Sequence, residues 1–476
     1  MKHYKFVLVL VMFINILASC KKDFLDVPDK TVLLRQAYVV DLKTTENFLN
    51  GIYVEIAKFH HGYYLIYPEL IADNIKPVAG SIPLNSHYLW AQQADDSKSA
   101  FGNTTFNMNP VWRDGYRIIR ECSFILETVD QYRSEDNVKA DNIKGQAYAL
   151  RALIHSFLVS TFAQAYSFSS DASHQGIPYI TTSNWTTPVT IQTVAEVYES
   201  LISDLTNAIE LLPSASTNAL TMNRNAARAF LSRIYFFKGD YQSSKNIAKE
   251  VSNEVPIMTG SAYPSKLFTP QETEALFQLR PASVTVGDPF STFFAGRYFA
   301  SPSQQFLATN DIATILTETP QDVRKAWVTL QSGNWAISKY PSGVVPNYGN
   351  PASAYFQTLI RSSEIYLIAA ESYAKLNIED SARFYLDAIR KRANPAAFSV
   401  TASGQALLDS INKERRKELA FEGFRMYDLL RLKQGVKRND ALNTSAKDLP
   451  YPSEKAVSPI PFSDANVSGL PQNPGY

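Results

Sequence analysis

Residues 228–251 read RAFLSRIYFFKGDYQSSKNIAKEV, and this stretch predicts two helices joined by a tight turn. Its first half places five side chains on one side of a helix: Ala229, Phe230, Arg233, Ile234 and Phe237. Gly239 and Asp240 are typical turn residues. The return helix carries a second face with Tyr241, Ile247, Ala248 and Val251. Because small residues let the two helices approach closely, the stretch predicts a helical hairpin.

The same plan returns in residues 362–392, SSEIYLIAAESYAKLNIEDSARFYLDAIRKR, with a turn around Asn377. Its apolar and small positions are Tyr366, Ala369, Ala370, Tyr373 and Ala374, then Ala382, Tyr385, Leu386 and Ile389. Both stretches resemble tetratricopeptide repeats, which are helical hairpins of about 34 residues that bury their faces by stacking on neighbours. We therefore predict a mainly α fold with a scaffold of such hairpins. Unrelated amphipathic hairpins in an irregular helical domain are the alternative.

Three further stretches have the apolar periodicity of helices. The clearest is residues 194–212, where Thr193 and Glu196 have capping-box spacing at the start and Pro213 follows the end. The other two faces consist of Ile118, Cys122, Ile125, Leu126 and Val129, and of Ala147, Leu150, Ile154, Leu158, Phe162 and Ala165. Since Cys122 lies on an apolar face, we predict a buried structural thiol.

Between the two hairpins, from about residue 255 to residue 360, the helical periodicity fades. Pro, Gly, Ser and Asn become frequent and aromatic residues cluster, which predicts a loop-rich insertion with short strands at most. The best strand candidate is residues 335–340, and residues 74–96 have the same loop-like character. Long loops on a rigid scaffold are where binding residues concentrate.

The N-terminus has the layout of a secretory signal, with Lys residues, an apolar run from Phe6 and the sequence Leu-Ala-Ser before Cys20. The run is shorter than the roughly 20 apolar residues that span a bilayer. The end of this segment resembles a bacterial lipobox, in which the cysteine is acylated. We expect residues 1–19 to be a lipoprotein signal peptide and two or three acyl chains on Cys20 to anchor the mature chain. An ordinary signal peptide is the alternative.

Composition and motifs exclude several functions. Removal of residues 1–19 leaves 44 basic and 45 acidic residues, and no long basic block predicts nucleic-acid binding. After acylation of Cys20, Cys122 would be the remaining thiol, so no intramolecular disulfide is expected. We find no HExxH, GxSxG, P-loop or GxGxxG motif, and we predict no catalytic residue, metal site or cofactor. An acid pair assembled from distant loops stays open.

Three separated segments resemble the SusD/RagB family of outer-membrane lipoproteins from Bacteroidota. They are NKERRKELAFEGFRMYDLLRLKQG at 412–435, SPIPFSDANVSGLPQNPGY at 458–476 and CKKDFLDVPDK at 20–30. With the hairpins, the resemblance covers nearly the whole mature chain. It implies a single SusD-like domain over residues 20–476, with the loop-rich insertion at about 255–360 and a signature C-terminal region at about 412–476.

The resemblance also implies a function without catalysis. Members of this family are surface-exposed outer-membrane lipoproteins that capture an oligosaccharide or another nutrient and deliver it to a SusC-like TonB-dependent transporter. A lipid tether would keep the protein near that transporter and raise its effective concentration. The alternatives are binding of peptides or another non-glycan nutrient, a repeat scaffold that binds only proteins, and a surface hydrolase with an unrecognised site.

A sugar site needs exposed aromatic planes beside amide, carboxylate or guanidinium groups. Loop placement selects six candidate ligand-binding residues: Asn85, Trp90, Arg297, Tyr298, Trp335 and Tyr348. For each of them a packed aromatic or a solvated polar group is the alternative. Three other tryptophans are predicted to be packed: Trp112, Trp185 and Trp327.

The signature segment carries charges at helical spacing: Glu414, Glu418, Glu422, Arg425, Asp428 and Arg431. On a continuous helix, opposite charges at these positions would meet along one strip. We predict a structural role for this strip, with packing register as its main contribution, and ligand binding is the alternative.

Overall fold

The computed structural model describes residues 35–59, 65–78, 84–94, 108–214, 218–280, 306–340 and 356–476. The predictions for residues 1–19, Cys20, Arg297, Tyr298 and Tyr348 therefore lie outside the described residues.

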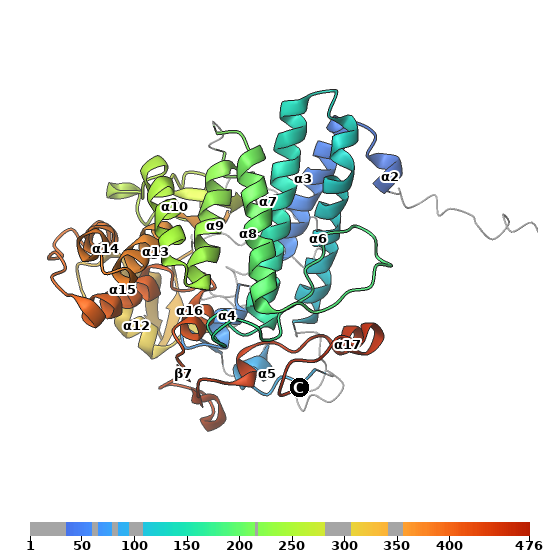
Figure 1. Ribbon diagram of the computed structural model, residues 1–476. Helices are drawn as coiled ribbons and strands as arrows, with labels where there is room; N and C mark the ends of the chain where they lie inside the picture. The colour runs from blue at the N-terminus through green and yellow to red at the C-terminus, as the bar shows by residue number, and fades with distance from the viewer. Residues whose placement is uncertain are drawn as a thin grey trace, which may run out of the picture.

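Long helices packed against one another form the scaffold (Figure 1). They are α3 (Leu42–Phe59), α6 (Asn109–Thr128), α7 (Asn137–Phe162), α8 (Val194–Leu211), α9 (Arg224–Lys238), α10 (Tyr241–Glu254), α13 (Ser362–Lys375), α14 (Glu379–Ala393) and α15 (Gly404–Glu418). Both predicted hairpins are present, as α9 with α10 and as α13 with α14. Because α10 packs on α13, the two hairpins stack on each other although the loop-rich insertion separates them in the chain. The mainly α prediction is confirmed.

Local sequence signals set the ends of these helices. The Thr193 side chain accepts a hydrogen bond from the Glu196 amide, and the Glu196 carboxylate accepts one from the Thr193 amide, so the predicted capping box of α8 is formed. Gly239 ends α9 in a left-handed conformation with φ of 85°, and Asn377 makes the second turn with φ of 58°. Cys122 is fully buried on α6, as predicted.

Short antiparallel strands lie beside the scaffold. One sheet has the order β1 (Ile75–Pro77), β3 (Phe306–Ala308), β5 (Asn334–Ile337), β4 (Val328–Gln331). Two further pairs are β2 (Ala275–Leu279) with β6 (Gln357–Arg361), and β7 (Val436–Lys437) with β8 (Asp448–Leu449). The strand expected at 335–340 is thus present in its first part, as β5.

The loop-rich insertion is expected to contain short strands and no helix, and this expectation is wrong at α12 (Asn310–Thr317). Thr309 caps this helix through its side chain, and Ile312, Ala313 and Leu316 are buried. Since α12 is only eight residues long, it shows too few apolar repeats for its period to be recognised in the sequence.

Shorter elements complete the fold, several of them at the lower end in Figure 1. The α-helices are α2 (Arg35–Tyr38), α4 (Tyr67–Leu70), α5 (Asn85–Tyr88), α16 (Arg425–Arg431) and α17 (Phe462–Ser468). The 3-10 helices are η4 (Val129–Tyr132), η5 (Gly260–Ala262), η7 (Val323–Trp327), η9 (Thr444–Ala446) and η10 (Glu454–Ala456). In the part of the chain that the structure describes, none of the helices combines the length and the hydropathy needed to span a bilayer.

The signature segment is not one continuous helix. It breaks between Glu418, the last residue of α15, and Arg425, the first residue of α16. At the break Gly423 has φ of 83°, and its amide donates to the Glu69 carboxylate at 2.8 Å. A Cβ atom on Gly423 would lie 2.8 Å from the Cδ1 atom of Leu65. Glycine therefore allows this turn to close onto the segment that contains α4.

Candidate ligand-binding site

Trp90 is buried and does not present its indole plane to solvent. The side chain is 7% exposed, and its ring nitrogen donates to the carbonyl oxygen of Ile71 at 3.0 Å. The guanidinium of Arg438 lies 4.1 Å from the ring centroid. The packed interpretation therefore holds for Trp90, and the prediction of an exposed stacking platform at this residue is corrected.

Asn85 and Trp335 lie on elements of the same region. Asn85 is the first residue of α5, which packs on β1, and Trp335 lies on β5, which pairs with β3 next to β1. Both side chains are partly exposed. Trp335 is thus part of the four-stranded sheet, and Asn85 begins a helix that packs on the first strand of that sheet, although the sequence separates them widely.

The described residues on either side of 281–305 and 341–355 are held by strand pairing and ring packing. Phe306 pairs with Pro77, and Leu279 pairs with Gln357. The amide of Phe356 donates to the Phe268 carbonyl oxygen at 2.9 Å, and the rings of Phe268 and Tyr340 are 4.7 Å apart. These contacts fix the chain on both sides of the segments that contain Arg297, Tyr298 and Tyr348.

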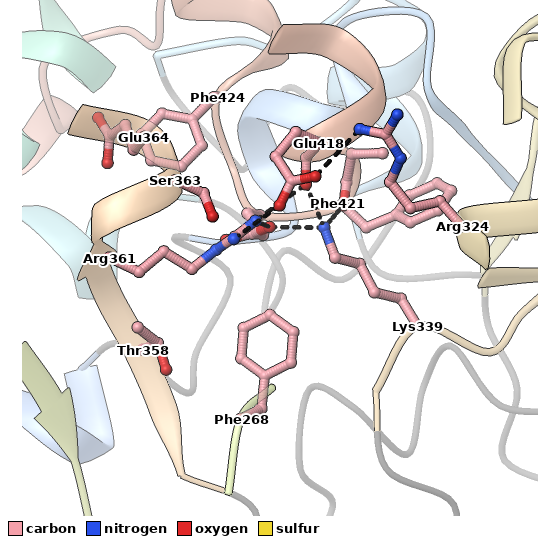
Figure 2. Close-up of polar contacts among 12 residues, drawn as sticks. Phe268, Arg324, Lys339, Thr358, Arg361, Ser363, Glu364, Glu418, Phe421 and Phe424 are labelled. Carbon is pink, nitrogen blue, oxygen red and sulfur yellow. Dashed lines mark hydrogen bonds and ion pairs between the residues drawn. The ribbon is translucent and has the colours of Figure 1, made fainter. Parts of the chain in front are cut away.

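A buried cluster of charges lies next to this region. Figure 2 shows Arg361, Lys339 and Arg324 converging on Glu418. Arg361 donates to Glu422 at 3.0 and 2.7 Å and to the Glu418 carboxylate at 2.8 Å. Lys339 donates to the Glu418 and Ala420 carbonyl oxygens at 2.8 and 2.9 Å. We call Glu274, Arg324, Lys339, Arg361, Arg392, Glu418 and Glu422 the buried charge cluster.

Opposite charges compensate for burial within this cluster. Burial alone would raise the pKa of Glu418, but Arg392, Arg361 and Arg324 together lower that pKa well below its ordinary value. Burial lowers the pKa of Lys339 to about 8, although Glu422 opposes this shift. One Glu418 oxygen accepts from Arg361 and Arg392. Protein donors thus engage the carboxylate, which supports a structural role.

The other Glu418 oxygen accepts from two further protein groups. Arg324 donates to it at 3.0 Å and the Tyr263 hydroxyl at 2.8 Å. Among the residues that the structure describes, no group of three or more His, Cys, Asp or Glu side chains is placed to hold a metal ion. The described geometry is that of a closely packed set of charges that pair with one another.

The charges of the signature segment do not pair along one helix as predicted. Glu422 pairs with Arg361 and Lys339 rather than with Arg425, and Arg425 pairs with Asp73 at 2.6 Å. This difference arises because the helix ends at Glu418 and the chain turns before Arg425.

Within the segment, Asp428 accepts from Arg431 at 2.8 Å, which is one of the expected contacts. Asp428 also pairs with Arg415 on α15 at 2.9 Å. The structural interpretation of these charges is supported, but they connect separate elements rather than successive turns of a single helix.

The sequence-based prediction for the three remaining tryptophans holds for two of them. Trp112 and Trp327 are buried, whereas Trp185 is 57% exposed. Trp185 stands in the connection between α7 and α8, within the polar run Thr-Thr-Ser-Asn-Trp-Thr-Thr-Pro at 181–188. A lone tryptophan among polar residues was the signal that could have identified it as a surface residue.

Two family models match this chain. Residues 23–236 match a model described as starch-binding associating with outer membrane, and residues 324–476 match the SusD family model. The chain is 26% identical over 430 residues to SusD-like protein P2 from Formosa agariphila, across 79% of this chain and 82% of that protein.

Solved structures have the same fold. A SusD superfamily protein from Bacteroides thetaiotaomicron is 26% identical with a TM-score of 0.81, and the match covers 91% of this chain and 100% of that one. A putative sugar binding protein from Bacteroides vulgatus is 28% identical with a TM-score of 0.78, and the match covers 92% and 99% of the two chains.

Proposed function

We propose, from the premise that this chain belongs to the SusD/RagB family, that it binds an oligosaccharide or polysaccharide at the cell surface for uptake. The observation that carries this proposal is the pair of family matches, one of which is described as starch-binding associating with outer membrane. The similarity to a putative sugar binding protein at 28% identity supports the same ligand class. The chain itself would perform no catalysis and would deliver the bound glycan to a SusC-like TonB-dependent transporter.

The proposed site uses loops on the helical scaffold. Trp335 would offer a flat apolar surface to a sugar ring, and Asn85 would hydrogen bond to hydroxyl groups. Arg297, Tyr298 and Tyr348 complete the proposed set and come from the two segments whose neighbouring residues are held by the sheets. The buried charge cluster would keep those neighbours in place when a ligand binds.

The membrane attachment is part of the proposal. Cys20 would be acylated and residues 1–19 removed, and the mature chain 20–476 would form one SusD-like domain that faces the cell exterior. Cys20→Ser should abolish palmitate labelling and remove the protein from the outer-membrane fraction. Unchanged labelling and fractionation would refute the lipid anchor.

Binding of glycans tests the central claim. The protein without residues 1–20 is titrated calorimetrically with maltohexaose, cellohexaose and laminarihexaose and screened on an array of neutral glycans. We expect at least one of these glycans to bind, and Trp335→Ala to weaken its binding by at least tenfold. Phe398→Ala is the matched control because this aromatic side chain is 90% exposed and lies on the connection between α14 and α15.

The outcomes separate the alternatives. Binding of peptides without binding of any glycan would preserve a nutrient-binding role and refute the sugar class. Turnover of a bound glycan by the purified protein would refute the non-catalytic role. Delivery is tested in cells, where deletion of the gene for the proposed SusC-like transporter should leave surface binding intact and abolish uptake.

A further inference from the structure

An open cleft of about 700 Å³ lies between α2, α3, α6 and the connection that carries Trp185. Figure 1 shows α2 beside α3 and α6 at the upper right, whereas α5 lies at the lower edge of the molecule. The cleft is therefore separate from the region of Asn85 and Trp335. Its lining combines aromatic, amide, guanidinium and carboxylate side chains.

Trp185 is held on a rigid turn although it is exposed. The Glu127 carboxylate accepts from the Ser183 amide at 2.8 Å and from the Ser183 hydroxyl at 2.5 Å. Arg35 donates to the Ser183 carbonyl oxygen at 2.9 Å, and Arg120 donates to the carbonyl oxygen of Asn184. A turn with this many bonds loses little conformational entropy when a ligand binds.

The indole ring of Trp185 packs against one buried guanidinium and otherwise stays largely exposed. The Arg120 guanidinium lies 4.9 Å from the Trp185 ring centroid and is itself buried at 5% exposed. Trp185 nevertheless keeps 57% of its surface exposed. Because large aromatic side chains are usually well buried, a tryptophan that is both fixed and exposed beside a cleft indicates a stacking surface.

The charged groups of the cleft balance one another. Arg117 pairs with Glu55 at 2.6 Å, and Arg35 lies 3.7 Å from Glu121. Two cations and two anions create no strong net field that would select a charged ligand. Their side chains are between 17% and 41% exposed, so they can hydrogen bond to hydroxyl groups at the cleft.

Amide and phenol groups extend this polar lining. Gln36 and Tyr38 belong to α2, and Asn47 belongs to α3. Amide side chains offer both donors and acceptors, which matches the hydroxyl groups of sugars. An indole plane beside such groups fits the apolar face and the polar edge of a sugar ring.

We propose that this cleft is a second glycan-binding site, specific for neutral oligosaccharides, with Trp185 as its stacking residue. The ligand class rests on the proposed function, whereas the position rests on the geometry of the cleft. A second site on the same chain would hold a long glycan while the site near Trp335 binds another part of it. Two sites on one chain would raise the effective concentration of the ligand at each.

Gly51 provides a way to close the cleft without disturbing the fold. It lines the cleft from α3, and a Cβ atom on it would meet no other atom within 4 Å. Gly51→Phe should therefore fill the cleft with an aromatic side chain and leave α3 intact, since replacing a helical glycine removes a local cost. Trp185→Ala tests the stacking residue directly.

The experiment compares these two variants with the wild type and with Trp335→Ala. The probes are maltohexaose, cellohexaose, laminarihexaose, mannohexaose and xylohexaose, with hexagalacturonate as the charged probe, and calorimetry reports affinity and stoichiometry. We expect Trp185→Ala and Gly51→Phe each to weaken binding of a neutral hexaose by at least tenfold at one site. Thermal melting within 2 °C of the wild type, on the order of measurement scatter, would show that both variants fold.

Each outcome decides between the two sites. Loss of binding in Trp185→Ala and Gly51→Phe with binding retained in Trp335→Ala supports the second site and refutes the first. Full binding of every neutral probe by both cleft variants overturns the second site, whatever Trp335→Ala does. Absence of any neutral hexaose binding in the wild type, or Trp185-dependent binding of hexagalacturonate alone, also overturns the proposal. Binding of a protein partner that needs Trp185 without any sugar would do the same.

Discussion

Arg361 is the residue whose replacement tests the buried charge cluster most directly. Its guanidinium donates five hydrogen bonds, to the carboxylates of Glu274, Glu418 and Glu422 and to the Glu418 carbonyl oxygen. The side chain is 1% exposed. Arg361→Met keeps an unbranched chain of similar length and removes the charge. We expect it to destabilise the protein strongly because carboxylates would remain buried with fewer cations.

The size of the expected loss in stability depends on which cations each carboxylate still contacts in Arg361→Met. Arg392 still contacts Glu274 and Glu418, and Lys339 still contacts Glu422. The loss is therefore smaller than the sum of five charged hydrogen bonds at about 1.5–3 kcal/mol each. Removal of one partner from a buried pair costs about 3–5 kcal/mol, and we expect a decrease of this size in the free energy of unfolding.

Urea unfolding followed by tryptophan fluorescence and circular dichroism measures this decrease at pH 7. The matched control is Arg133→Met, whose side chain is 43% exposed beside Asp130 and Asp141 and should change the free energy of unfolding far less. The double variant Arg361→Met with Glu422→Gln should recover at least about 1 kcal/mol relative to Arg361→Met, because it neutralises the carboxylate that has lost both Arg361 bonds and keeps only Lys339.

The way in which the destabilisation by Arg361→Met changes with pH tests the same reasoning independently. Burial would raise the pKa of Glu422, but Arg361 and Lys339 lower it below its ordinary value. In wild type this carboxylate contributes stability above pH 4.5 that is lost as the pH falls. Without Arg361 the pKa of Glu422 should rise, so the destabilisation should shrink between pH 7 and pH 5. A loss below about 1 kcal/mol at pH 7, or a loss that grows toward pH 5, would refute this reasoning.

Three further changes test other parts of the structure. Arg425→Ala removes a partly buried pair with Asp73 at 2.6 Å and should lower the free energy of unfolding by about 2–3 kcal/mol, and unchanged melting would discard its structural role. Burial and the nearby Glu274 raise the pKa of Glu272 to about 7. The free energy of unfolding of wild type should therefore fall by about 2 kcal/mol relative to that of Glu272→Gln as the pH rises from 5 to 8. If denaturant titrations give the same change in unfolding free energy with pH for both proteins, this reasoning is wrong. Gly423→Ala should lower the free energy of unfolding by about 1–2 kcal/mol more than Gly469→Ala, as measured by thermal unfolding. Both glycines have positive φ, but only a Cβ atom on Gly423 would meet another atom. Equal losses would show that the close approach to Leu65 is tolerated.

The pairing of the buried charges could not be predicted from the sequence. The spacing of Glu422 and Arg425 suggested a contact along one helix, but the chain turns at Gly423 and each residue pairs with a distant partner. The partners Arg361 and Asp73 come from segments far away in the chain, and no local pattern indicates which carboxylate will meet which guanidinium. The structural role was predictable, whereas the partners were not.

The tryptophans show the same limit for the candidate site. Trp90 was predicted to be exposed and is buried, and Trp185 was predicted to be packed and is 57% exposed. Loop composition alone cannot decide such a case, because the exposure of a loop residue depends on which elements pack beside it. Asn85 is expected on a loop and instead begins the short helix α5, whereas Trp335 lies on the short strand β5, and only the tertiary structure relates these two elements.

The sequence by itself determined the helical hairpins, their turns and their caps, because these depend on side chains three or four residues apart. It also carried the family resemblance, through motifs that are read in order along the chain. Only the tertiary structure decided the break in the signature helix, the partners in the buried charge cluster and the cleft beside Trp185. Each of those features requires segments that are distant in the chain to meet, and their contacts therefore follow from the packing of the whole fold.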